Sequence, residues 1–351
     1  MTKIMKKILF FGLTVWMSVS ANAQCAHTKD EWGYHHAADI KIDNIYYQFI
    51  NDSTVRVTAY DTGLDAIQSR YEGDVIIPEY VTFDDKSLII QNGWHFTEAA
   101  QRGNIDYLGN TFHVTEISEW TFWGHDMNAT SISFPSSIIN MNNAKIRGAF
   151  QLKSITFSEG FSCDLTNDFF SLEKIEEDFI KDHYSLEYIY FPEEGHINIG
   201  NNAFNHQVHL SGIRLSNSIH HVGEKAFYNC SRLERLVVGK NVESLGAEAF
   251  GLCENISEIT VEAETPPTIA ENTFTDATYQ TATLTVPEGC EEAYRSAMGW
   301  KRFFAASTDG IDEMGPAARE DGLYYTIDGI SVDRPLKKGI YIHKGKKVIK
   351  Q

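Results

Sequence analysis

Residues 208–261 read VHLSGIRLSNSIHHVGEKAFYNCSRLERLVVGKNVESLGAEAFGLCENISEITV, and this stretch decides the fold. It repeats two short elements at one period of 23 residues. The first has the form apolar-x-x-apolar-x-apolar and begins at Leu210, Leu233 and Ile256; the second ends in Ala-Phe, at Phe227 and Phe250. Two independent elements share one spacing, which indicates a run of structural repeats.

Weaker copies extend the pattern in both directions. A single short unit cannot bury its apolar face, whereas stacked units share one core. We therefore predict a solenoid whose parallel strands form a ladder, with one Phe of each coil stacked along the axis. Gly223 and Gly246 are expected to allow a turn that a side chain would block. Further strands are expected at 75–78, 129–134, 152–157, 186–191 and 281–286, with degenerate second elements at 117–122, 146–150 and 175–179.

The repeat resembles the BspA-type leucine-rich repeats of bacterial surface proteins. Their pattern is roughly L-x-x-I-x-I-P followed by V-x-x-I-G-x-x-A-F-x-x-C, and residues 208–261 follow it closely. The resemblance implies a horseshoe-like leucine-rich repeat solenoid over 39–304, mainly β with short helices or turns. Within it, 39–78 is similar to the family's N-terminal cap and 281–304 to its C-terminal cap, while the repeats are irregular at 135–180.

The N-terminus has the features of a secretory signal peptide over residues 1–23. Three lysines precede an apolar stretch of secretory length, and an Ala-x-Ala cleavage site ends at Ala23. Cleavage there predicts a secreted or cell-surface protein that begins with a linker at 24–38 and has no transmembrane helix once the signal is removed. A lipid on Cys25 is the alternative, although the residues before it lack the Leu of the usual lipobox.

Two segments do not follow the repeat. Residues 83–106 form an insertion, and insertions in solenoids emerge on one face and often carry binding. Residues 305–351 are expected to form a linker and a small β module, with hairpin turns at Asp328-Gly329 and Lys344-Gly345. The module resembles short C-terminal segments of exported bacterial proteins, so it either sorts or anchors the chain or only stabilises it.

Composition and motifs argue against nucleic-acid binding, membrane-surface binding, metal binding and the common catalytic motifs. The net charge of −18 disfavours nucleic acids and anionic membrane surfaces as partners. The chain has no nucleophile elbow, zinc-protease, P-loop or dinucleotide-binding motif, so no catalytic residue and no cofactor are predicted. The pairs His35-His36 and His220-His221 are not expected to hold a metal, because strand neighbours point to opposite faces. Cys230 and Cys253 lie at the same phase of adjacent coils; they either form a disulfide or, as we favour, stay as buried thiols.

The outward face of the strand ladder gives the best functional clue. Tyr188, Tyr190, Arg214 and Arg235 are expected to cluster there, between Ser- and Thr-rich flanks, with His183 and His209 near the rims. Tyr and Arg are enriched in binding hot spots. The alternative is that these residue types simply suit exposed strand positions.

Two functional hypotheses follow. The first is an exported, non-enzymatic protein that binds a protein or glycan macromolecule on a host or neighbouring cell through the ladder face, in the manner of adhesion that the resemblance implies. The alternative is an extracellular enzyme or carbohydrate-active accessory protein with its site in the 83–106 insertion, where Trp94, His95 and Glu98 are the first candidates.

Overall fold

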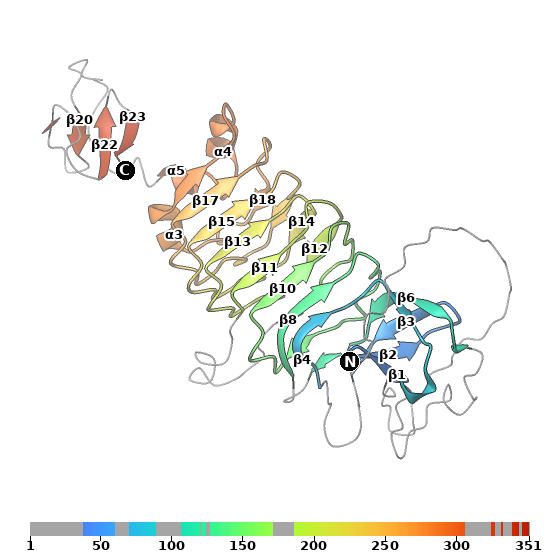
Figure 1. Ribbon diagram of the computed structural model, residues 1–351. Helices are drawn as coiled ribbons and strands as arrows, with labels where there is room; N and C mark the ends of the chain where they lie inside the picture. The colour runs from blue at the N-terminus through green and yellow to red at the C-terminus, as the bar shows by residue number, and fades with distance from the viewer. Residues whose placement is uncertain are drawn as a thin grey trace.

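The chain folds as a stack of coils in which each turn adds a strand to a growing ladder (Figure 1). The computed structural model describes residues 38–59, 70–88, 107–119, 121–123, 127–170 and 186–305, together with short strands of the C-terminal tail between 324 and 350. The fold is therefore the predicted mainly-β solenoid with parallel strand ladders and short helices.

The main ladder consists of two parallel four-stranded sheets that continue one another, with β11 beside β13 (Figure 1). Each strand ends in an apolar-x-apolar alternation that turns the apolar side chains into the core. The strands expected from the repeat are confirmed. The first sheet contains β4 (Glu72–Ile76), β8 (Asn128–Phe134), β10 (Ser154–Phe157) and β11 (Tyr188–Tyr190), and the second contains β13 (Gly212–Leu215), β15 (Arg235–Val238), β17 (Glu258–Val261) and β19 (Thr283–Thr285).

A second parallel ladder is formed by the other element of the repeat. Its strands are short because the backbone of each coil turns within two to four residues of entering this ladder. They are β12 (Ile197–Ile199), β14 (Ile219–Val222), β16 (Ser244–Leu245) and β18 (Thr268–Ile269), and β7 (Phe122–Trp123) pairs with β9 (Ile146–Arg147) nearer the N-terminus.

Stacked phenylalanine rings fill the core between the ladders, as predicted. The rings of Phe204 and Phe227 have centroids 5.4 Å apart, and those of Phe227 and Phe250 lie 5.5 Å apart and within 3° of parallel. The stack continues to Phe274 at 5.3 Å. All four side chains are buried. Each ring contributes apolar burial, and the stack fixes the register of one coil on the next.

The repeated glycine stands where a side chain would be blocked, as predicted, but the cause is the neighbouring coil rather than its own conformation. Neither Gly223 nor Gly246 has a positive φ, so neither makes a turn that needs glycine for its conformation. Instead, a Cβ at Gly223 would lie 2.6 Å from the backbone nitrogen of Asn201, and one at Gly246 would lie 2.6 Å from that of Glu224. Glycine is required here because the preceding coil approaches too closely for any side chain.

The N-terminal end of the stack is covered by a five-stranded sheet in the order β1-β2-β3-β6-β5. Strand β3 runs parallel to β6, while the other pairs are antiparallel. A 3-10 turn, η1 (Lys86–Leu88), follows β5 along the chain and lies at the start of the insertion. The strands are β1 (Ile40–Ile42), β2 (Ile45–Phe49), β3 (Thr54–Val57), β5 (Tyr80–Thr82) and β6 (Thr111–Ile117).

Short helices cover the C-terminal end of the stack: α3 (Asp276–Thr281), α4 (Glu291–Ser296) and α5 (Arg302–Ala305). Trp300 is fully buried and donates its Nε1–H to the Pro267 carbonyl at 2.7 Å. Tyr294 is also fully buried and donates its hydroxyl to the Ala263 carbonyl at 2.6 Å. Both large side chains therefore close the core with their polar atoms satisfied.

The tail forms an antiparallel sheet of its own in the order β21-β20-β22-β23. Its strands are β20 (Tyr324–Thr326), β21 (Ser331–Val332), β22 (Gly339–His343) and β23 (Lys346–Lys350). His343 pairs with Lys346, which leaves a two-residue connection at the predicted Lys344-Gly345 hairpin.

Several sequence predictions lie outside the described residues: the signal peptide at 1–23, the linker at 24–37, the part of the insertion at 89–106 and the repeat element at 175–179. Within the described part of the chain, no helix is long and apolar enough to cross a membrane.

Candidate functional site

The ladder face is the outward side of the strands of the main ladder, and the structure places the predicted residues on it. Pairing sets Ser154 opposite Tyr188 and Gly212 opposite Arg235, so side chains at the same phase form rows along the stack. In the first sheet the rows read Ser131, Ser154 and Tyr188, and Ser133, Thr156 and Tyr190. In the second sheet they read Gly212, Arg235, Glu258 and Thr283, and Arg214, Val237, Thr260 and Thr285.

The two tyrosines of β11 are exposed aromatic side chains of this face, on which Ile76 of β4 is also exposed, in register with Ser133. Tyr188 is 65% exposed and Tyr190 is 50% exposed. Tyr190 donates its hydroxyl to Glu159 Oε1 at 2.7 Å. This hydrogen bond raises the pKa of Tyr190, because it favours the protonated phenol beside a carboxylate. Tyr188 makes no side-chain hydrogen bond with any residue that the structure describes.

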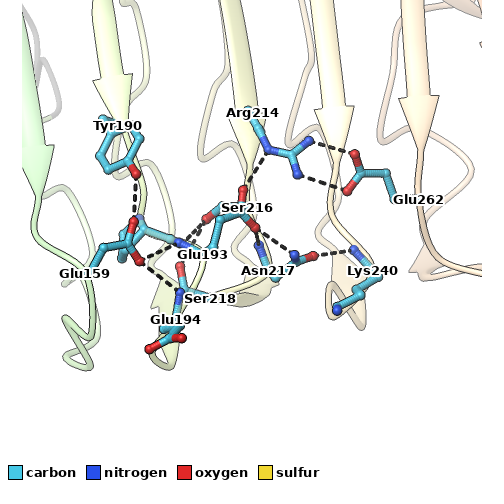
Figure 2. Close-up of polar contacts among 11 residues, drawn as sticks. Glu159, Tyr190, Glu193, Glu194, Arg214, Ser216, Asn217, Ser218, Lys240 and Glu262 are labelled. Carbon is cyan, nitrogen blue, oxygen red and sulfur yellow. Dashed lines mark hydrogen bonds and ion pairs between the residues drawn. The ribbon is translucent and has the colours of Figure 1, made fainter.

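Arg214 is bound on both sides by carboxylates. Its Nε donates to Glu193 Oε1 at 3.0 Å, and its two terminal nitrogens donate to the two oxygens of Glu262 at 2.7 and 3.1 Å (Figure 2). Hydrogen bonding to Glu262 raises the pKa of Arg214 above its ordinary value, against an opposing effect of desolvation. Three of the five N–H groups of this guanidinium are therefore bonded to carboxylates.

The network continues through the turns that follow the ladder strands (Figure 2). Glu159 Oε2 accepts the backbone N–H groups of Glu193 and Glu194 at 3.2 and 3.3 Å. Glu193 Oε2 accepts the side-chain amide of Asn217 at 2.7 Å, and Asn217 Oδ1 accepts the N–H of Lys240 at 3.1 Å. Desolvation acts to raise the pKa of Glu193, but the bonds from Arg214 and Asn217 outweigh it, and this pKa is lowered. Tyr190 and Arg214 thus belong to a chain of bonds that ties successive coils together.

Arg235 differs from Arg214, because it forms no ion pair or hydrogen bond with any described side chain. Its stem leans over Gly212: a Cβ built on that glycine would lie 3.9 Å from Arg235 Cβ and 4.0 Å from its Nε. Tyr188 stands on the strand beyond Gly212. The predicted cluster therefore divides into a bonded half, Tyr190 with Arg214, and a free half, Tyr188 with Arg235.

The carboxylates that bind Arg214 and Tyr190 were missed by sequence reasoning, which followed only the strands. The signal was present in the turns. Glu159, Glu193, Asn217 and Lys240 each stand two residues after the last apolar residue of a ladder strand, so the parallel stacking places them side by side.

Histidines gather on the second ladder rather than on the ladder face. The rings of His196 and His220 have centroids 4.0 Å apart. His220 and His221 both approach Glu243, at 3.5 and 3.6 Å. The expectation that these strand neighbours point to opposite faces is therefore wrong, since the pairing of β12 with β14 shifts register here. No group of His, Cys, Asp and Glu in the described residues could hold a metal ion.

The remaining candidates can be placed only in part. Trp94, His95, Glu98 and His183 lie outside the described residues. His209 Nδ1 lies 3.3 Å from Arg232 Nη1. Arg232 is on the same coil as Arg235, and His209 is on the preceding coil. Cys230 and Cys253 are separate buried thiols whose sulfur atoms approach the carbonyl oxygens of Phe204 and Phe227, at 3.5 and 3.1 Å.

Solved structures with related coils come from several bacteria. A leucine-rich repeat protein from Bacteroides ovatus is 20% identical, with a TM-score of 0.48; the match covers 70% of this chain and 52% of that chain, about half its length. A leucine-rich repeat protein from T. pallidum is 19% identical, with a TM-score of 0.41 and coverage of 64% and 84%. A leucine rich cell surface protein from Faecalibacterium prausnitzii is 13% identical, with a TM-score of 0.18 and coverage of 74% and 97%. No curated protein matches the chain significantly.

The sequence family is defined by the repeats themselves. The BspA type leucine rich repeat region, with 6 copies, matches residues 79–180 and 173–299, which together make up more than half of the chain. These residues contain all the strands of the main ladder except β4, which precedes them. The protein belongs to the BspA-type leucine-rich repeat family.

Proposed function

We propose that this protein is an exported, non-enzymatic binding protein that holds a protein or glycan partner on the ladder face, as an adhesin does. The observation that carries the proposal is the free half of the cluster. Tyr188 and Arg235 are exposed and their side chains bond to no described residue, while Tyr190 and Arg214 are fixed by carboxylates. An exposed Tyr loses little side-chain freedom on binding, and an Arg without a partner offers a guanidinium that can pair bidentately, so both residue types act as anchors.

The form of the face supports a broad contact. Its side chains stand on paired strands with fixed spacing, and the bonded half holds the adjoining turns in place. The enzyme alternative gains no support from the described residues, because the side chains it names lie outside them.

The test compares two double variants of the full chain. Tyr188→Ala with Arg235→Gln removes the free half, whereas Tyr80→Ala with Arg232→Gln removes the same residue types elsewhere; Tyr80 is 57% exposed on β5 and Arg232 is exposed on the coil of Arg235. Binding is measured by biolayer interferometry against a panel of extracellular-matrix proteins and a glycan array. A tenfold or larger loss in the first variant alone supports the ladder face. Equal binding by both variants and the parent rejects it.

A further inference from the structure

The free half of the cluster has the form of a notch between two side chains. Gly212 contributes no side chain, and the Arg235 stem leans into the space above it, with Nε 4.0 Å from the place of a Cβ on that glycine. The Arg235 guanidinium therefore lies over β13, the strand between its own strand and that of Tyr188. A ring-shaped group stacked on Tyr188 is thus within reach of this guanidinium.

The charge of the notch selects for a carboxylate. Arg235 is exposed and has no carboxylate within ion-pair distance among the described residues, although the chain carries −18. Glu258 is its register partner on β17, yet the arginine stem leans the other way, over Gly212. A guanidinium binds a carboxylate through two parallel hydrogen bonds. The acidic body repels a polyanion, so a ligand with isolated carboxylates fits best.

The other side chains of the notch favour a sugar over an acidic peptide. The exposed ring of Tyr188 offers a flat apolar face with a hydroxyl at its tip. On β10, Ser154 is the register partner of Tyr188 and Thr156 that of Tyr190, and neither hydroxyl is bonded to a described side chain. A ligand that presents a flat ring face, several hydroxyls and one carboxylate matches all of these groups, whereas an acidic peptide side chain would use Arg235 alone.

We infer that Tyr188, Gly212 and Arg235 form a subsite for a carboxylated sugar, a uronic or sialic acid residue of a glycan. The inference rests on the proposed function and names the ligand class of the same face. Arg235 pairs with the carboxylate, Tyr188 stacks on the ring, and Ser154 and Thr156 bond the hydroxyls of the next residue.

The experiment measures binding of the full chain to defined oligosaccharides by titration calorimetry. The probes are a hyaluronan tetrasaccharide, which carries glucuronic acid, and sialyllactose, each paired with its neutral methyl ester. We expect one acid form to bind and its ester to bind at least tenfold more weakly; which of the two acids binds distinguishes the sources. Arg235→Gln should weaken the acid tenfold and abolish the difference between acid and ester. Gly212→Val, which displaces the Arg235 stem from its place over this glycine, should also weaken binding tenfold, and Arg232→Gln should change nothing.

The outcomes separate this inference from the proposed function. Equal binding of acid and ester, no binding of either acid, or an Arg235→Gln variant that binds like the parent overturns the carboxylate subsite. If the Tyr188→Ala, Arg235→Gln variant still loses a protein partner in the panel experiment, the ladder face stands and only the ligand class is wrong. If no ladder variant changes any binding, both proposals fail.

Discussion

Arg214 and Glu262 form a bidentate ion pair across 48 residues of sequence. Arg214 is on β13 and Glu262 follows β17, so the pair passes over the whole coil of β15. Most other polar links between these coils join residues 23 or 24 positions apart, as between Lys240 and Asn217. Arg214 therefore holds together coils that do not otherwise touch through their strands.

Replacing Arg214 tests this link. Arg214→Ala should lower the free energy of unfolding by about 1 kcal/mol, near the upper end for exposed ion pairs, because it leaves Glu193 and Glu262 without their shared cation. Arg214→Lys should lose less of the free energy of unfolding than Arg214→Ala but still fall below the parent, since an ammonium cannot pair bidentately. Urea denaturation at low salt and in 1 M NaCl measures both effects, and the loss should shrink in high salt.

The matched control is Glu264→Gln, two residues from Glu262. Glu264 is exposed and forms no ion pair with described residues, so its replacement should leave stability unchanged. An Arg214→Ala variant as stable as the parent in low salt would show that the pair adds nothing.

Alanine should destabilise the protein at one glycine of this repeat and be tolerated at another. Gly223→Ala should destabilise by about 2–3 kcal/mol, because the new Cβ meets the backbone of the preceding coil at 2.6 Å and backbone cannot move aside cheaply. Gly212→Ala should be tolerated, since its nearest neighbours would be at 3.7 Å or more. Thermal unfolding followed by circular dichroism compares the two. Equal melting temperatures would rule out close coil packing as the reason for Gly223.

Leu252 occupies a strained backbone position. Its φ is +55°, and the equivalent residues of the two preceding coils, His206 and Asn229, have φ of +59° and +57°. The left-handed region suits Asn better than Leu, and Leu252 is 47% exposed, so it loses little packing. Leu252→Asn should therefore stabilise the chain by about 0.5–1 kcal/mol. The reverse change, Asn229→Leu, should destabilise by a similar amount, and two changes of the same sign would contradict the backbone explanation.

His206 should make stability depend on pH. Burial lowers its pKa below the ordinary value of 6.5, and its Nδ1 is buried without a hydrogen-bond partner among the residues that the structure describes. Below pH 6.5 the unfolded chain takes up a proton that the folded chain resists. The contribution to stability is thus complete above pH 6.5 and is lost as pH falls towards the folded pKa.

His206→Asn keeps a residue suited to the left-handed backbone and removes this titration. Its free energy of unfolding, measured by urea denaturation, should fall less between pH 7.5 and pH 5.5 than that of the parent. Asn229→His, at the equivalent position of the next coil, should steepen the fall. A His206→Asn variant with the parent's slope would show that this imidazole does not titrate differently on folding.

The fold could be predicted because the repeat places apolar residues at fixed phases. Leu210, Leu233 and Ile256 recur at one period, so their burial and the stacking of the Phe rings follow from translation by one coil. The outward position of Tyr188 and Arg235 follows from the alternation within each strand in the same way.

The bonding of the candidate site could not be predicted by that reasoning. Arg214 finds its partners in turns, where the repeat does not fix side-chain direction, and one partner is two coils away. The requirement for Gly223 depends on the distance between coils rather than on its own conformation. Periodicity along one strand therefore identifies which side chains point outward. It does not identify which of these side chains are already bonded to residues of neighbouring coils.

The stacking of coils also determines how the molecule would respond to force. In the described stack, most bonds between coils join neighbours, so a pull on the two ends loads the coil interfaces in series. Each coil that detaches would release about 80 Å of extended chain. Arg214 and Glu262 would make the coils between them yield together. A chain built in this way lengthens in steps under tension. Each step relaxes the tension, so the coils that detach first lower the peak force on a contact bound elsewhere on the ladder.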